Sequence, residues 1–176
     1  MSKSQNGLNT GLNTSANTGA QFATKQLDNP LWQYACQFYS QPGVESALLE
    51  LQDKHGADIN LVLQALWLAS VKVEWGPRCI PHDYQKWMTQ HVLPLRQMRR
   101  TMKIEWPEEK GKAYEEFRQQ VKKLELKAEQ VALAMLFASS EGLSEGDVSE
   151  KTNMILVGQN MDVLPEQFDL LISLLP

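Results

Sequence analysis

The residues best suited to chemistry lie close together: Asp53 and His55 are followed by Asp58 and Asn60. An imidazole changes its charge near neutral pH, so His55 could act as a general base or a ligand if Asp53 or Asp58 oriented its ring. Catalysis would also need a nucleophile or a metal ion, and an oxyanion donor, at the same place. The sequence holds no HExxH, phosphate-binding loop or dinucleotide fingerprint. It therefore predicts no catalytic residue, no cofactor and no metal site.

The same residue types also suit a corner between two helices. His55 falls in the last turn of a predicted helix, where it meets the negative end of the helix dipole, and Gly56 suits the left-handed conformation that ends such a helix. Asp58 can accept hydrogen bonds from the free amides that begin the next helix. We therefore predict a structural corner made by His55, Gly56, Asp58 and Asn60, with a catalytic His55 as the alternative.

The spacing of apolar residues predicts an all-α fold, because no stretch shows strand-like alternation between hairpin turns. Asn29 and Pro30 begin a helix, and a second one runs from Pro42 to Gly56. Residues 59–71 are apolar nearly all round, which is typical of a central helix. We expect a compact multi-helix bundle that includes one long helix, about residues 107–139, with a heptad stripe of Tyr114, Phe117, Val121, Leu124, Ala128, Val131, Met135 and Ala138.

A second helical stripe precedes the long helix. It contains Tyr84, Met88, His91, Leu95, Met98 and Met102. Pro94 interrupts it, and proline removes one backbone hydrogen bond and collides with the preceding turn. The sequence therefore predicts a kink or a restart near Leu93.

Composition divides the chain into three parts. Residues 1–27 are rich in Asn, Thr, Ser and Gly, which predicts a disordered tail. Residues 28–140 form the predicted helical domain. Residues 141–176 are an acidic segment with short amphipathic helices, which either pack on the bundle or are offered to a partner.

The overall balance of the chain is ordinary for a globular protein, with a net charge of −4 and 43% hydrophobic residues. There is no signal-peptide pattern and no apolar run long enough to span a bilayer, so a cytoplasmic protein is expected. Cys36 and Cys79 show no metal-ligand spacing, and we interpret both as reduced packing residues. The oligomeric state is open, since a heptad stripe serves a bundle as well as a dimer.

A basic helix face and several tryptophans form the candidate interaction surface. Four cations recur at helical spacing, and Arg and Trp are frequent anchors of protein interfaces. The arginines could instead pair with glutamates of the long helix or, less in keeping with the acidic chain, bind RNA phosphates. Trp106 adjoins the same region. The candidate residues are Trp75, Trp87, Arg96, Arg99, Arg100 and Lys103.

The segment LWQYACQFYSQPGVESALLELQDKHGADINLVLQALWLA, followed by WMTQHVLPLRQMRRTMK and VKKLELKAEQ, resembles a family of small proteobacterial proteins known as a domain of unknown function. The resemblance covers roughly Asn29 to Leu136. It implies a helical, bacterial, cytoplasmic protein and brings no activity with it.

The sequence thus favours a non-enzymatic adaptor or regulatory protein that acts through contact with a protein partner. The first alternative is a small-molecule-binding protein or an unrecognised enzyme, with a pocket between the central helix and the Trp75 to Trp87 region and with His55 or His82 as polar groups. The second is weak RNA binding through the face from Arg96 to Lys103, although nucleic acid is an unlikely partner for this composition.

Overall fold

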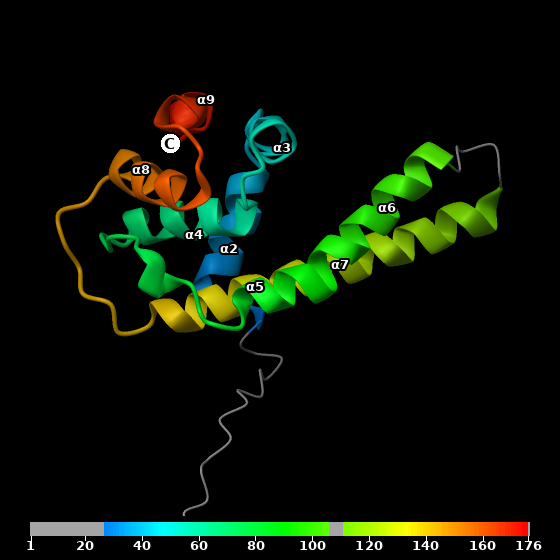
Figure 1. The fold of residues 1–176 in the computed structure, drawn as a ribbon, viewed down its shortest axis with the longest axis horizontal. Helices are drawn as coiled ribbons and strands as arrows, with labels where there is room; N and C mark the ends of the chain where they lie inside the picture. The colour runs from blue at the N-terminus through cyan, green and yellow to red at the C-terminus, as the bar shows by residue number, and fades with distance from the viewer. Residues whose placement is uncertain (1–26, 106–110, 176) are drawn as a thin grey trace, which may run out of the picture.

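The computed structural model describes residues 27–105 and 111–175. Within these ranges the regular structure is helical, apart from one isolated antiparallel bridge between Val73 and Glu145 (Figure 1). The predicted all-α class is confirmed. The predicted disordered tail, up to residue 26, and Trp106 lie outside the described residues.

One apolar helix lies at the centre of the body of the molecule. Ten of the 12 residues of α4 are buried, which confirms the central helix predicted from its composition. Helices from both ends of the chain surround it. The body consists of α2 (Pro30–Tyr39), α3 (Val44–His55), α4 (Ile59–Ser70), α8 (Glu150–Met161) and α9 (Asp169–Ser173), with the short 3-10 segments η1 (Pro77–Cys79) and η4 (Pro165–Phe168).

Local capping signals set the ends of these helices. The Asn29 side chain accepts a hydrogen bond from the backbone N–H of Trp32 at 2.9 Å, and Pro30 occupies the first turn of α2. Helix α3 begins at Val44 rather than near Pro42, because Gly43 has a left-handed φ of 87°.

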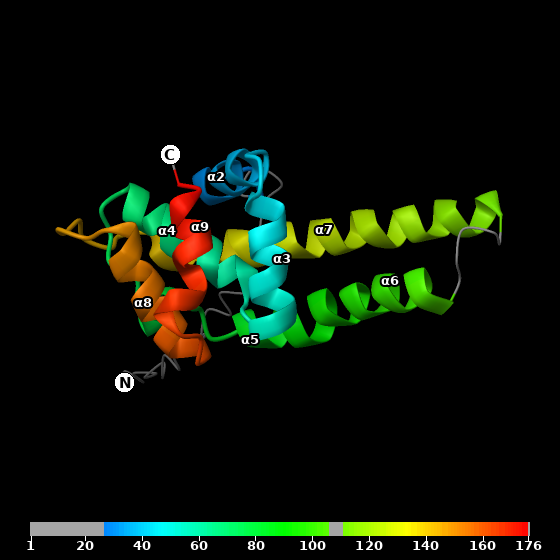
Figure 2. The ribbon, with the colours of Figure 1, turned by 90° about the horizontal axis from the view of Figure 1, so that it is seen from above.

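A long helical hairpin extends beyond the body (Figures 1 and 2). The first half of the hairpin is a continuous helical segment made of α5 (Tyr84–Trp87), the π-helical turn η2 (Met88–Val92) and α6 (Leu93–Glu105). The second half is α7 (Lys112–Ser140), which returns beside it. We call α6 together with residues 112–131 of α7 the arm. The long helix is confirmed, but it begins at Lys112 because Gly111 has a non-helical φ of 101°.

The π-helical turn marks the break that Pro94 predicts. The Leu93 N–H donates to the carbonyl of Met88, five residues back, so the helix accommodates one extra residue before Pro94. The extra residue rotates the side chains that follow it about the helix axis, so a different set of residues faces the core. Val92 is fully buried, whereas His91 and Met98, both placed in the predicted stripe, are exposed. The stripe prediction was therefore wrong for His91 and Met98, whereas Met102 is buried and Leu95 packs against the core as expected.

The C-terminal segment packs on the body. Helix α8 lies against α4, and Figure 2 shows α9 beside α3. Phe168 and Leu171 are 0% exposed and belong to the same core as Leu66 of α4. The core is therefore continuous across residue 140, where composition suggests a boundary.

Two smaller findings complete the fold. Cys79 is buried, as expected for a packing residue, but Cys36 is exposed on the outside of α2, so its predicted packing role was wrong. None of the described helices combines the length and the apolar character needed to cross a bilayer.

Candidate functional site: the two sides of the helical arm

A charged network occupies the seam between the two helices of the arm. Glu125 of α7 is only 5% exposed, and it accepts hydrogen bonds from both the Nε and the Nη2 of Arg99. Arg96 places its Nε 3.5 Å from Glu125 and donates its Nη2 to Glu129. Bidentate Arg–carboxylate pairs fix geometry as well as adding energy. The two helices are thus held in one register by ions where the heptad pattern predicts apolar contacts.

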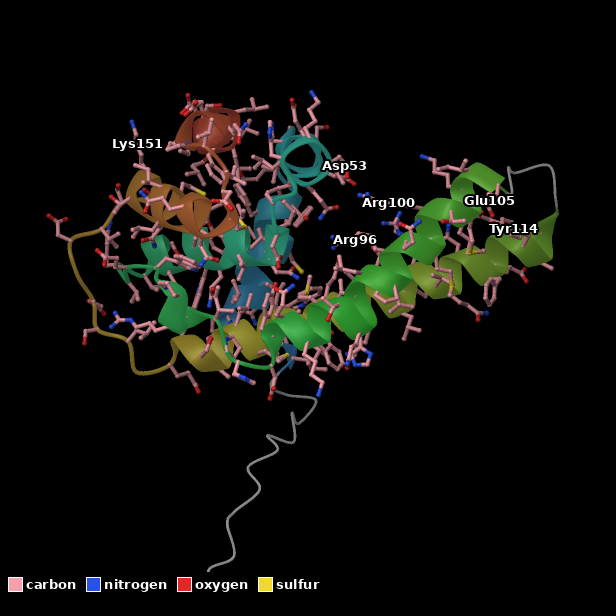
Figure 3. The ribbon with its side chains drawn as sticks, viewed as in Figure 1. Asp53, Arg96, Arg100, Glu105, Tyr114 and Lys151 are labelled. Carbon is pink, nitrogen blue, oxygen red and sulfur yellow. The ribbon has the colours of Figure 1, made fainter. Side chains whose placement is uncertain are left out.

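Arg100 joins the arm to the body. Its Nη2 donates to the Oδ1 of Asp53 at 2.6 Å and to the Oε1 of Gln52 at 3.0 Å, both on α3. Figure 3 shows Arg96 and Arg100 on the side of the arm that faces Asp53. We call this the inner side. Lys103 is exposed, and no carboxylate of the described residues lies within 4.0 Å of its Nζ.

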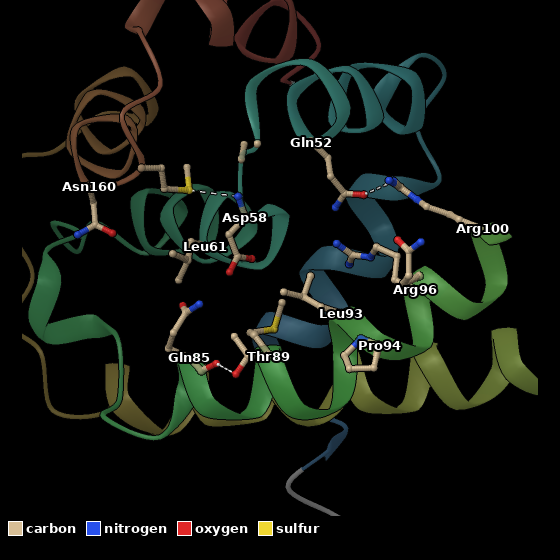
Figure 4. Close-up of a pocket in the computed structure, with 15 residues that line it drawn as sticks. Gln52, Asp58, Leu61, Gln85, Thr89, Leu93, Pro94, Arg96, Arg100 and Asn160 are labelled. Atoms are coloured by element: carbon tan, nitrogen blue, oxygen red, sulfur yellow. Dashed lines mark hydrogen bonds between the residues drawn. The ribbon is translucent and has the colours of Figure 1, made fainter.

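A cavity of about 750 Å³ lies on the inner side, where the arm meets the body (Figure 4). It is bounded by the corner between α3 and α4, the end of α8 and the π-helical turn. Its polar lining includes Gln52, Asp58, Gln85, Thr89, Arg96 and Arg100. The helix corner and the arginine face, two separate features of the sequence, therefore line one cavity.

The helix-corner residues take up capping positions. Gly56 ends α3 with a left-handed φ of 67°, and the Asp58 side chain accepts a hydrogen bond from the Asn60 N–H at 3.0 Å. The other oxygen of Asp58 accepts from the Tyr84 hydroxyl at 2.9 Å. Half-buried His55 is the last residue of α3, and in the described structure neither Asp58 nor Asp53 is hydrogen-bonded to it. The carboxylates that could orient a catalytic imidazole thus have other partners.

Burial perturbs the ionisable groups around the cavity. It raises the pKa of Asp58, although the hydrogen bonds from Tyr84 and from the Asn60 N–H act in the opposite direction. It also raises the pKa of Glu129, against the effect of the Arg96 hydrogen bond. For Arg96, burial acts to lower the pKa, but its contacts with Glu129 and Glu125 raise it overall. The network therefore consists of desolvated charges that compensate one another.

The tryptophans do not join the arginines in one patch. Trp75 is 2% exposed, and its Nε1 donates to the Oε1 of Gln64 at 3.1 Å, so its assignment to an interaction surface was wrong. Trp87 is half-buried, donates its Nε1 to the Ala128 carbonyl at 2.9 Å and lies against the His91 ring with centroids 4.3 Å apart. A buried indole is tolerated where its N–H has a hydrogen-bond acceptor, and for Trp75 that acceptor is Gln64.

The polar residues predicted for a pocket are also placed differently. The cavity lies near the start of α4, but Trp75, Trp87, His55 and His82 do not line it. The His82 side chain is fully exposed and pairs with its neighbour Asp83.

The other side of the arm carries apolar side chains. On α7, Phe117 and Leu124 are rotated by about 80–100° from Glu125 in one direction, and Glu129 is rotated by about 40° in the other. On α6, Met98 is rotated from Arg99 in the direction opposite to Arg96. Because Arg96 and Glu129 pair on the inner side, the three apolar residues share the opposite side.

We call Met98, Phe117 and Leu124 the outer face, and they are 47%, 54% and 56% exposed, respectively. Leu95 and Val131 flank them and are half-buried. The heptad stripe placed Phe117 and Leu124 inside the fold, and this was wrong for both. The spacing of the charged residues was the available signal, because Arg96, Arg99, Glu125 and Glu129 recur at three and four residues and so share one face of each helix.

The comparisons with known proteins give a family match without an assigned function. No curated protein and no solved structure matched the chain. A family model described as "Protein of unknown function (DUF2390)" matches residues 30–136, which is more than half of the chain and coincides with the resemblance stated above. The match covers α2 through most of α7, including the cavity residues of the arm and its outer face. The chain therefore belongs to the DUF2390 family.

Proposed function

We propose that the protein is a non-enzymatic adaptor or regulatory module that binds a protein partner through the outer face of its arm. The observation that carries the proposal is the exposure of Met98, Phe117 and Leu124 on one side of an element that extends from the body. Contiguous exposed apolar side chains, as opposed to scattered ones, are typical of interaction sites.

The energetics favour a use for this face. Full burial of a Phe, Leu or Met side chain contributes about 1.5–3 kcal/mol relative to exposure, and these three residues are about half-exposed. A partner that covered them would gain several kcal/mol without rearranging the arm, because the ion pairs of Glu125 already fix the two helices. The outer face is thus preorganised for binding.

A capture experiment from native lysate tests the proposal. The bait proteins are the wild type, Leu124→Glu and, as a matched control, Leu126→Glu. Leu126 lies two residues further along the same helix, is 52% exposed and points away from the outer face. We expect the wild type and Leu126→Glu to capture the same proteins and Leu124→Glu to lose them. Identical captures from all three baits would refute a role for the outer face.

Binding of a small polar molecule is a second candidate, favoured by the cavity of about 750 Å³. The convergence of Asp58, Arg96 and amide side chains there would suit a ligand rich in hydrogen-bonding groups. Thermal-shift screening against metabolites tests this, since a ligand at 100 times its Kd stabilises the protein by about 2.7 kcal/mol. An absence of shifts across a broad library would argue against it.

RNA binding through Arg96, Arg99, Arg100 and Lys103 has less support, because the three guanidinium groups already pair with carboxylates of the protein. Such binding would weaken steeply as salt is added. Absence of binding at low salt would exclude it.

A further inference from the structure

We propose that the partner of the outer face is a second copy of this chain, bound through the arm as an antiparallel two-fold dimer. This inference rests on the proposed function, since it names the occupant of the same face. In the dimer the α7 helices of the two copies lie antiparallel to each other, and the two arms together form a four-helix bundle.

The apolar residues of the outer face are spaced for self-association. Phe117 and Leu124 are seven residues apart, which returns them to the same side of α7. In a two-fold contact, if residue i touches residue j, then j touches i. An axis that passes near residues 120 and 121 therefore places Phe117 on Leu124 of the second copy and Leu124 on its Phe117. Met98 of α6 adds to the same apolar layer.

The charges beside this stripe select the antiparallel orientation. Glu116 precedes Phe117, and Lys127 follows Leu124 on the flank of α7 that points away from α6. Among the described residues, the side chain of Glu116 pairs with the exposed Lys112 at 3.7 Å, and Lys127 donates to the neutral Gln130. About the same axis, Glu116 and the second copy's Lys127 differ in height by about 3 Å, at 1.5 Å per residue, which a lysine side chain can span. The pair occurs twice, and in a parallel dimer, where α7 would lie on α6, it does not form.

The size of the surface is compatible with a dimer that depends on concentration. Residues 112–131 of α7 extend for about 30 Å, and two packed helices are about 20 Å wide. The outer side of the arm thus offers about 600 Å² per copy, against about 800 Å² in a stable interface of standard size. The charged seam behind it supports the idea, because the ion pairs of Arg99 and Arg96 hold each hairpin together and leave its apolar side chains free for the second copy.

Light scattering after size exclusion, over a range of concentrations of the full chain, measures the association. We expect the mass to rise toward that of two chains. Leu124→Glu should keep the mass of one chain, and Leu126→Glu should behave as the wild type. Glu116→Lys and Lys127→Glu should each raise the dissociation constant roughly fivefold or more, and the double variant should return to the wild-type value. Circular dichroism of each variant verifies its helical content.

Crosslinking tests the orientation. In a Cys36→Ser background, Gln120→Cys places a thiol next to the axis, and a short thiol-reactive crosslinker should join two chains. Gln119→Cys is the matched control, because the neighbouring position points to the other side of α7. Equal crosslinking at both positions would overturn the antiparallel arrangement.

The outcomes separate the two proposals. A wild-type chain that stays at the mass of one copy up to about millimolar concentration, the weak limit of specific association, would overturn the dimer. If Leu124→Glu then still abolished capture of a different protein, the proposed function would stand alone. If the wild type neither associated with itself nor captured any protein, both proposals would fail.

Discussion

Replacement of Asn153 by alanine should detach the C-terminal segment from the central helix. The side chain of Asn153, in α8, is 0% exposed, and it makes three hydrogen bonds to α4 and to the loop after α4. Its Oδ1 accepts from the backbone N–H of Trp75 at 2.9 Å. Its Nδ2 donates to the carbonyls of Ala65 and Val73 at 3.0 and 2.9 Å. One amide therefore links α8 to α4 and to the loop after it.

The expected loss follows from these three bonds. A buried hydrogen bond contributes about 1 kcal/mol net, and a buried group left without a partner costs about 1–3 kcal/mol. The Ala65 carbonyl lies inside α4 and keeps its helical hydrogen bond, so the Trp75 N–H and the Val73 carbonyl suffer most. We expect Asn153→Ala to reduce the free energy of unfolding by about 3–4 kcal/mol, which is a large part of the 5–15 kcal/mol typical of a domain.

Urea denaturation followed by circular dichroism measures this loss. Asn160→Ala is the matched control, because Asn160 is an exposed asparagine on the same helix, and its replacement should change stability by less than about 0.5 kcal/mol. Limited proteolysis should cut Asn153→Ala between α7 and α8 sooner than it cuts the wild type. A loss below about 1 kcal/mol, or equal losses for the two variants, would refute the reasoning that this amide anchors α8.

Two further predictions concern the cavity and the C-terminal turn. Burial raises the pKa of Asp58, so the stability that this group contributes is present at low pH and declines as the pH rises through its folded-state value. Between about pH 4 and about pH 7, urea unfolding should therefore show Asp58→Asn gaining stability relative to the wild type, and a relative loss would contradict the direction of the shift. Gly158→Ala would place a Cβ 2.6 Å from the Val163 carbonyl oxygen and should destabilise the fold by about 1–3 kcal/mol, whereas an unchanged melting temperature would show that the turn yields easily.

Local signals in the sequence predicted the body well. Asn29 with Pro30, Gly56 and Asp58 act through hydrogen bonds and dihedral preferences within a few residues, so their effect is visible without the rest of the chain. The central helix was predictable because a helix that is apolar on every side must be enclosed. The resemblance to a family of unknown function also followed from the sequence alone, and its limits agree with the DUF2390 match.

The arm was predicted less well, for two physical reasons. Periodicity assumes an uninterrupted α-helix, and the extra residue of the π-helical turn changes which residues face inward after Met88. It also assumes that apolar residues occupy the seam. A hairpin of two helices has only one internal seam, and here Glu125 and Arg99 fill part of it, which leaves Phe117 and Leu124 outside. The burial of Trp75 depends on Gln64, which lies 11 residues earlier in the chain, so helical spacing could not reveal the contact.

The number of residues in the π-helical turn determines how α6 is rotated about its own axis relative to α5. Each residue advances a helix by about 100°, so removing one residue between Met88 and Val92 would turn all of α6 by that angle relative to α5. Arg96 and Arg100 would swing away from α7 and α3, and different side chains would meet the body. A single-codon deletion at this place would thus act on the whole projecting helix, while the same deletion in an exposed loop would stay local.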